Sequence, residues 1–346
     1  MRFGPVPLDQ AMGAILAHSV PLPGQPMRKG AVLTHADIET LRAAGLTEVT
    51  VAALDAGDVA EDGAATRLAM ALVPGDQGLT LTRAFTGRVN LKATGPGIVA
   101  LDAAAIHALN RIHPSITLAT LPPFARVVAG TLVGTVKIIS YAVPEDALGA
   151  AESLANAAIR VLPVVRRRAG LVLTEVAGQD SKLAAKGKRA VEARLRALGM
   201  TLAGVVVVPH EARAIAAALT KMSGDMLLIL TGSATSDLHD TGPEALRLAG
   251  GHVARFGMPV DPGNLLFHGA LGDRPVIGLP GCARSPALNG ADWVLQRYAC
   301  GVQVTDDDIA AMGVGGLLKE IALRGHLREA TDKRPDEPTP LDFLFA

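Results

Sequence analysis

Residues 226–246 read MLLILTGSATSDLHDTGPEAL, and this stretch decides the fold of the second half of the chain. Its first five residues are all apolar, which predicts a strand buried on both faces of a sheet. A loop of small and hydroxyl-bearing residues follows from Thr231 to Asp240. Pro243 is then typical of the first turn of a helix. Strand, loop and helix in this order indicate one unit of an α/β fold.

The same alternation recurs on both sides of this unit. Apolar strands are expected at 171–174, 205–208 and 276–279, and helices at 181–198, 211–222, 243–248 and 285–298. Apolar strands that alternate with helices predict a three-layer sandwich with a mostly parallel sheet. Because ligands bind at the carboxyl ends of strands in such sheets, the loops 231–240 and 280–286 are expected to form the site.

Composition limits the classes of function. Of the 346 residues, 49% are hydrophobic and 19% charged, which indicates a globular protein with a substantial core. Lys and Arg (33) balance Asp and Glu (33) and only 3% of residues are aromatic, which argues against nucleic acid or an anionic membrane as a partner. Two cysteines and no apolar run of about 18 residues predict a cytoplasmic protein without a membrane span.

The pattern divides the chain into three parts. An α+β accessory domain is expected over residues 1–165, the α/β domain over 166–305, and a partly disordered C-terminal tail over 306–346. In the first part, apolar spacing predicts a helix from Leu8 to His18 and another from Pro144 to about Leu162. The arginines at 166–168 are expected to end the second helix, where cations are favourable.

Three polar residues of the first part alternate with apolar ones. Arg88, Asn90 and Lys92 therefore share one face of a predicted strand. A solvated face is the simpler interpretation, and a second binding surface is the alternative.

The loop 231–240 has the chemistry of a cradle for a phosphate or a polar heterocycle. Small residues such as Gly232 let backbone N–H groups approach a ligand. Further donors come from the hydroxyls of Thr231, Ser233, Thr235 and Ser236. The carboxylates of Asp237 and Asp240 are suitable for Mg²⁺, and Asp240 for orienting a nucleophile. An ordinary loop in which Asp240 only caps the next helix is the alternative.

The loop 280–286 contributes Gly281, Cys282, Arg284 and Ser285. Cys282 stands before a predicted helix, where a thiol is activated, but the sequence places no base beside it. A small residue that fills space is the plainer interpretation. Arg284 is able to reach a phosphate, against the alternative of a solvated side chain.

Residues 168–301 resemble the molybdopterin-binding domain family, shared by molybdopterin adenylyltransferases and molybdenum insertases. The family's first loop, Thr-Gly-Gly-x-Ser followed by Asp and Pro-Glu-Ala-Leu, is matched at Thr231, Gly232, Asp240 and 243–246. Thr235 replaces the serine and Ser233 the second glycine. Gly278-Leu-Pro-Gly281 with Ser285 resembles the second loop, and Pro262-Gly263 resembles the family's Pro-Gly turn.

The resemblance implies that molybdopterin and its phosphate bind between the two loops. Thr231, Gly232, Ser233, Thr235 and Asp240 would line the pterin side, and Gly281, Cys282 and Ser285 the other wall. Asp240 would be catalytic or would position Mg²⁺.

Two differences from the family pattern argue against an adenylating activity. The acidic Gly-Asp-Glu motif is absent after the first strand, where Glu175 and Asp180 are the nearest acids. Asp261 and Asn264 flank the Pro-Gly turn in place of basic residues, which disfavours nucleotide phosphate.

The expected function is therefore molybdopterin binding in molybdenum cofactor biosynthesis, by a homo-oligomer. Nucleotidyl transfer from ATP or CTP with Mg²⁺, or molybdate insertion, would be its reaction if it is an enzyme, with a separate nucleotidyltransferase as a partner. A non-catalytic carrier or scaffold is one alternative. A pyridine-nucleotide salvage hydrolase of the competence-damage type is another, although this domain usually comes first in those proteins.

Overall fold

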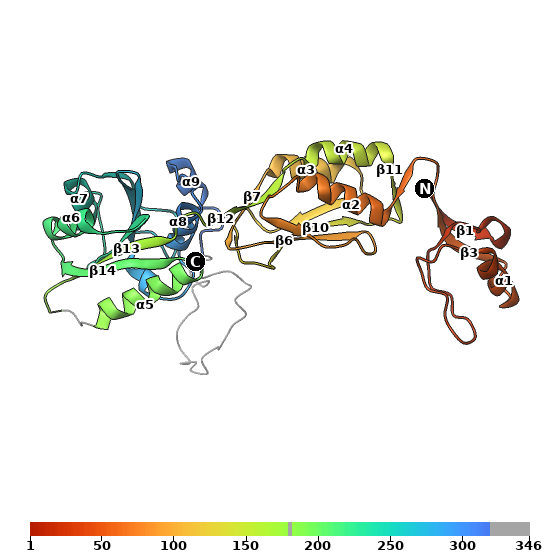
Figure 1. The fold of residues 1–346 in the computed structure, drawn as a ribbon, viewed down its shortest axis with the longest axis horizontal. Coiled ribbons are helices and arrows are strands. Elements are labelled where there is room, and N and C mark those ends of the chain that lie inside the picture. Colours follow the sequence, from red (N-terminus) through yellow and green to blue (C-terminus); the bar gives the residue numbers. More distant parts are fainter. Residues whose placement is uncertain (179–181, 319–346) are drawn as a thin grey trace, which may run out of the picture.

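The computed structural model describes residues 1–178 and 182–318. The molecule is elongated and has three lobes along its axis (Figure 1): an N-terminal lobe (residues 1–57), a middle lobe (58–163) and a C-terminal lobe (164–318). The first two lobes have separate hydrophobic cores, and the third has one core on each face of its sheet. The predicted accessory domain 1–165 thus contains two cores, and the domain boundaries stay a prediction.

The C-terminal lobe is built on a six-stranded sheet of order β14-β13-β15-β18-β17-β16. Its strands are β13 (Arg168–Glu175), β14 (Thr201–Pro209), β15 (Met226–Leu230), β16 (His252–Phe256), β17 (Phe267–Leu271) and β18 (Arg274–Leu279). Strands β14, β13, β15 and β18, the first four in this order, are parallel to one another. Helices α5 (Lys182–Arg196) and α8 (Gly290–Ala299) share a core with one face, and α6 (Ala212–Lys221) and α7 (Thr241–Leu248) with the other. The predicted three-layer α/β fold with a mostly parallel sheet is confirmed.

Residues of β15 show why these strands are apolar throughout. Leu228 and Leu230 belong to the core under α5 and α8, whereas Leu227 and Ile229 belong to the core under α6 and α7. Successive side chains of a strand point to opposite faces, so a strand covered on both sides needs apolar residues at every position.

Two features of this lobe differ from expectation. The hairpin of β16 and β17 is antiparallel and was not predicted; the ring of Phe267 lies over Gly278, where a Cβ would stand 1.9 Å from a ring carbon. Helix α8 begins at Gly290, not at Ser285, because a 3₁₀ turn (η2, Gly281–Arg284) and an extended segment come first. Asn289 caps α8 in a capping box with Asp292.

The middle lobe has helices on one side of its sheets (Figure 1). One sheet has the order β5-β6-β10-β8, from β5 (Leu79–Leu81), β6 (Arg88–Ala93), β8 (Ile116–Thr120) and β10 (Leu132–Ile138). A second has the order β12-β7-β9, from β7 (Gly97–Leu101), β9 (Arg126–Val127) and β12 (Ile159–Pro163). The helices are α2 (Glu61–Leu72), α3 (Ala103–Ile112) and α4 (Glu145–Ala155), and β4 (Asp58–Ala60) pairs with β11 (Ala142–Pro144).

The long helix predicted from Pro144 to about Leu162 is wrong. Helix α4 ends at Ala155, and the following residues form β12, which pairs with β7. Pairing across the sheet satisfies the backbone of 159–163 and buries Ile159 and Val161, which overrides their helical spacing. The arginines at 166–168 therefore end no helix, and Arg168 opens β13.

The N-terminal lobe is a three-stranded sheet of order β1-β3-β2, from β1 (Arg2–Pro7), β2 (Ile15–Leu16) and β3 (Glu48–Ala53). Helix α1 (His35–Ala43) begins with the capping box of Thr34 and Asp37. The helix predicted from Leu8 to His18 is wrong: a 3₁₀ turn (η1, Leu8–Gln10) forms at its start, Gly13 follows with a φ of +78°, and Ile15–Leu16 form β2. The apolar spacing there reflects burial of Leu8 and Leu16 in the lobe's core.

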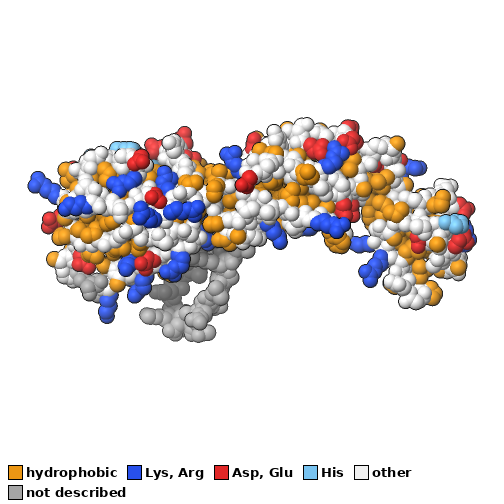
Figure 2. Space-filling view, viewed as in Figure 1, with side chains coloured by type: hydrophobic (Ala, Val, Ile, Leu, Met, Phe, Trp, Pro, Cys, Tyr) orange, Lys and Arg blue, Asp and Glu red, His pale blue; other side chains and the backbone are white. Residues whose placement is uncertain are grey.

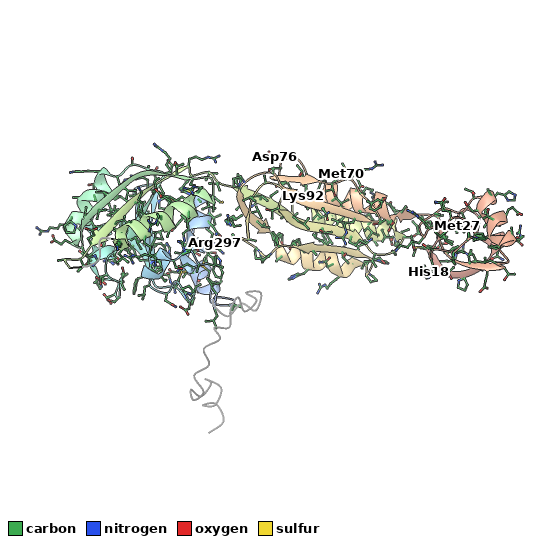
Figure 3. The ribbon with its side chains drawn as sticks, turned by 90° about the horizontal axis from the view of Figure 1, so that it is seen from below. His18, Met27, Met70, Asp76, Lys92 and Arg297 are labelled. Atoms are coloured by element: carbon green, nitrogen blue, oxygen red, sulfur yellow. The ribbon has the colours of Figure 1, made fainter. Side chains whose placement is uncertain are left out.

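The C-terminal and middle lobes are in contact. The guanidinium of Arg297 lies 4.1 Å from the ring centroid of Phe124, and Figure 3 labels Arg297 at this junction. Arg126 donates to the carbonyl of Ala197 at 2.9 Å, and Ile98 of β7 is buried in the C-terminal lobe's core.

Beyond α8 the chain forms α9 (Asp306–Ala311), and Leu317 then bridges to Asp261. The remainder of the predicted tail, 319–346, lies outside the described residues. In the described part of the chain, no helix combines the length and the apolar character needed to span a bilayer.

A buried histidine lies on β17, which is next to the edge strand β16 of the C-terminal lobe's sheet. His268 of β17 is 1% exposed, and its Nδ1 lies 2.8 Å from the hydroxyl of Tyr298 on α8. Burial lowers the pKa of His268, with smaller contributions from Asp306, which raises it, and from Arg255 and His252. Burial also raises the pKa of Tyr298 to about 12.

We expect this histidine to make the lobe sensitive to acid. Its pKa is lower in the fold than in the unfolded chain, so stability present above pH about 6.5 is lost as the pH falls below that value. His268→Gln should reduce this loss. The measurement is urea unfolding at pH 7.5 and 5.5, followed by the fluorescence of Trp293, the single tryptophan of the chain. An equal loss of stability in both proteins would contradict the assignment.

Candidate ligand-binding site

Two loops meet at the carboxyl end of the parallel sheet. Loop 231–240 follows β15 and loop 280–286 follows β18. These strands are neighbours, with Leu230 paired to Leu279, so the two loops begin side by side.

A cavity of about 290 Å³ lies between the loops. Its lining consists of Ala234, residues 261–265 around the Pro-Gly turn, and residues 280–282. Gly263 has a φ of +148°, and a Cβ there would stand 2.9 Å from the backbone of Gly290, so the turn requires glycine. Of the predicted ligand-binding residues, Gly281 and Cys282 line this cavity.

The start of loop 231–240 is fixed by hydrogen bonds. Thr231 is buried and donates its hydroxyl proton to the carbonyl of Ser233 at 2.6 Å. The N–H of Gly232 donates to the hydroxyl oxygen of Thr174 at 2.7 Å, and this oxygen also lies 2.9 Å from Nδ1 of His210. Thr174 is near the carboxyl end of β13, and His210 directly follows β14. Neither residue is predicted from the sequence to belong to the site.

Asp240 organises the second half of the same loop. One carboxylate oxygen accepts the N–H of Ser236 at 2.9 Å and its hydroxyl at 3.3 Å, and the other accepts the N–H of Thr241 at 2.6 Å. Hydrogen bonds from the backbone of Ser236, and then of Thr241, hold the pKa of Asp240 below its usual value despite partial burial. Asp240 is the N-cap of α7.

The two aspartates of this loop do not present a ready metal site. The carboxylate of Asp237 accepts a hydrogen bond from the N–H of His239 at 2.7 Å. The carboxylate of Asp240 accepts hydrogen bonds from the N–H groups of Ser236 and Thr241. Among the described residues no group of three or more His, Cys, Asp or Glu side chains is placed to hold a metal ion. Binding of Mg²⁺ by Asp237 and Asp240 stays a prediction. Of the other acids considered, Glu175 is exposed and Asp180 lies outside the described residues.

Arg284 joins the two loops. It donates to the carbonyl of Thr231 and, at 3.4 Å, to that of Gly281, while its Nε is buried without a partner. Burial lowers the pKa of this guanidinium. No carboxylate forms an ion pair with it in residues 1–178 and 182–318, so its charge is compensated only by carbonyl dipoles. A half-buried cation of this kind favours an anion as a ligand.

The remaining predicted residues have more ordinary surroundings. Cys282 is exposed, and its Sγ accepts the amide N–H of buried Asn289 at 3.0 Å. The hydroxyl oxygen of Ser285 accepts the N–H of Ala287 at 3.2 Å. Thr235 is buried, whereas Ser233 and Ser236 are exposed.

Arg194 of α5 holds loop 281–289 from behind. Its side chain is 9% exposed, and its Nε donates to Asp292 at 2.6 Å. The other four N–H groups donate to carbonyls at 2.8–3.3 Å, those of Ala190, Ala283, Ser285 and Ala287. All five donors of the guanidinium are thus used, three of them on the loop. Nothing in the local sequence signals this role.

Comparison with known proteins identifies the domain. Residues 178–297 match the family model described as a probable molybdopterin binding domain. This segment belongs to the molybdopterin-binding domain family. Residues 5–53 match a domain of unknown function, DUF8806.

Among solved structures, the chain is similar to the molybdopterin biosynthesis moea protein from Pyrococcus horikosii. The identity is 16%, over 87% of this chain and 76% of that chain, with a TM-score of 0.29. No curated protein matches the chain.

The Arg194–Asp292 pair gives a prediction for the molybdopterin-binding domain. Arg194→Met leaves a buried carboxylate and three loop carbonyls without their donor, and should destabilise this lobe by about 3–5 kcal/mol. Urea unfolding followed by Trp293 fluorescence measures the loss.

Two further variants complete this test. Adding Asp292→Asn to Arg194→Met should restore part of the stability, because it removes the unpaired charge. The exposed Arg196→Met on the same helix is the control and should change stability by less than about 0.5 kcal/mol. A cost below about 1 kcal/mol for Arg194→Met would contradict the positioning role.

Proposed function

We propose that this protein binds molybdopterin between loops 231–240 and 280–286, with the phosphate beside Arg284, and acts in molybdenum cofactor biosynthesis. The family of residues 178–297 supports the ligand and the role. The observation that carries the proposal is the half-buried guanidinium of Arg284, which contacts both loops and has no carboxylate partner among the described residues.

The charge of Arg284 suits a phosphate. A buried cation without a counter-ion is unfavourable, and a doubly charged phosphate would supply the missing charge. Its Nε is buried and has no hydrogen-bond partner among the described residues, so the hydrogen-bonding capacity of the guanidinium is not fully used within the protein.

The cavity beside the Pro-Gly turn suits the pterin. Asp261 and Asn264 provide a carboxylate and an amide on its lining, and neither is a cation. A carboxylate accepts N–H groups such as those of an aminopyrimidine ring, and it repels phosphate. The loss of basic residues at this turn therefore supports a heterocycle in the cavity and a single phosphate site at Arg284.

The contacts of Asp240 support binding without catalysis by this residue. Both of its carboxylate oxygens accept backbone N–H groups of its own loop. Nucleotidyl transfer from ATP or CTP, or molybdate insertion, would then need a group other than Asp240, a Mg²⁺ ion held elsewhere, or a separate nucleotidyltransferase. A carrier of molybdopterin, whether a monomer or a homo-oligomer, is the form of the proposal that these contacts favour.

Arg284 variants test the ligand. Arg284→Gln should weaken molybdopterin binding about 10- to 100-fold, because it removes a charge-assisted hydrogen bond, and Arg284→Lys should lose less. Binding is measured by titrating the purified chain with fresh molybdopterin and detecting the fluorescent oxidised pterin. The control, Arg213→Gln on the exposed face of α6, should bind normally. Failure of the unaltered chain to bind molybdopterin, or tight binding of a pyridine nucleotide instead, would overturn the proposal.

Asp240 variants separate carrier from enzyme. Asp240→Ser keeps a good helix cap but has no carboxylate, so we expect molybdopterin binding within about three-fold of the unaltered chain. The titration is repeated with ATP or CTP and Mg²⁺, and nucleotide consumption is followed. Consumption by the unaltered chain that Asp240→Ser abolishes would contradict the non-catalytic form of the proposal.

A further inference from the structure

The sheet β5-β6-β10-β8 of the middle lobe has one uncovered face. Helices α2 and α3 pack on its inner side, where Val89, Leu91 and Val136 are buried (Figure 1). The alternate residues of β6, Arg88, Asn90 and Lys92, lie on the outer side, as their spacing predicts. Figure 3 labels Lys92 on this lobe.

Cations gather on this outer face. Lys137 of β10 is directly opposite Arg88 in the antiparallel register, so two like charges are cross-strand neighbours. Such a pair is destabilising. None of Arg88, Lys92 and Lys137 forms an ion pair within the described parts of the chain; Lys137 donates to the carbonyl of Thr86. The charge of Lys137 acts to lower the pKa of Glu61, at the start of α2, although burial of Glu61 raises that pKa overall.

Two large apolar side chains lie at one end of the same face. Phe85 is 76% exposed and Ile139 is 62% exposed. Phe85 and Arg88 exchange backbone hydrogen bonds of 3.1 Å, and Ile138 donates to the carbonyl of Gly87 at 2.8 Å, so the backbones of Phe85 and Ile139 lie at the same end of the sheet as Arg88 and Lys137. Figure 2 shows hydrophobic and basic side chains together along the lower edge of the middle lobe.

The turn that carries Phe85 is held in place. Thr86 and Gly87 have φ values of 47° and 69°, and the N–H of Gly87 donates to Asp62 at 2.6 Å. An exposed aromatic on a fixed turn loses little conformational entropy when it is buried by a partner.

We propose that Phe85, Arg88, Lys92, Lys137 and Ile139, the basic sheet face, dock a partner protein that presents an acidic segment with an apolar side chain. Charge complementarity carries the assignment, since partner carboxylates would relieve the repulsion between Arg88 and Lys137. Arg88 and Lys92 are four residues apart on a strand, about 13 Å, which sets the spacing of the carboxylates.

An acidic protein fits this face better than nucleic acid does. The face has three cations and one aromatic ring, too few for a phosphate track with base stacking. The chain as a whole has no net positive charge. The face belongs to the middle lobe and the ligand loops to the C-terminal lobe, so the proposal does not depend on molybdopterin binding.

The experiment uses the full chain and a fluorescent ten-residue peptide of Glu and Asp with a central Leu. Fluorescence anisotropy at low salt should show binding that weakens at high salt. Arg88→Glu with Lys137→Glu should reduce the affinity at least about ten-fold, and Phe85→Ser several-fold. The control is Arg213→Glu with Lys221→Glu, a double charge reversal on exposed α6, which should stay within about two-fold.

Three results would overturn the proposal. The first is that the peptide does not bind, or that the control variant, Arg213→Glu with Lys221→Glu, loses as much affinity as the Arg88 and Lys137 variant. The second is tighter binding of a 20-base-pair DNA duplex that the Arg88 and Lys137 variant abolishes. The third is micromolar self-association that Phe85→Ser abolishes, which would make a second copy of the chain the occupant.

The like-charge pair allows a check without any partner. Arg88→Glu alone places a carboxylate opposite Lys137, so it should raise the midpoint of thermal unfolding of the middle lobe by a few degrees. Lys92→Glu is opposite Leu132 in the register and should raise it less. Circular dichroism during heating measures both. A lower midpoint for Arg88→Glu would contradict the presence of repulsion on this face.

Discussion

The guanidinium of Arg194 is the contact on which the site depends. Loop 281–289 leaves the sheet at Pro280 and becomes an α-helix only at Gly290, and no backbone N–H of the described residues donates to the carbonyls of Ala283, Ser285 and Ala287. Buried carbonyls need donors, and one arginine from α5 supplies them for Ala283, Ser285 and Ala287. The wall formed by Gly281, Cys282 and Arg284 takes its position from a side chain that lies behind it.

The local sequence predicts the units that local physics determines. The apolar runs of β13, β15 and β18 and the loops after β15 and β18 depend on neighbouring residues. The errors fall where distant contacts decide. Residues 159–163 become a strand because β7 pairs with them, and the hairpin of β16 and β17 is compatible with the sheet because Gly278 leaves room for Phe267. No periodicity encodes these partners.

The candidate site shows the same division. The small and hydroxyl-bearing residues of loop 231–240 identify a cradle, but residue types alone do not say which atoms are already bonded. Asp240 is a residue type suited to catalysis but has the contacts of a helix cap. Arg284 donates to loop carbonyls and, among the described residues, forms no ion pair with an acid. Thr174 and His210 come from two other strands, and only the fold brings them to Gly232.

The separate core of the N-terminal lobe affects how the molecule responds to heat and to ligand. The N-terminal core shares no residue with the others, so we expect it to melt in a step of its own, and a single melting temperature would then not describe the chain. A small molecule bound at loops 231–240 and 280–286 would shift the step of its own lobe and leave the N-terminal step in place.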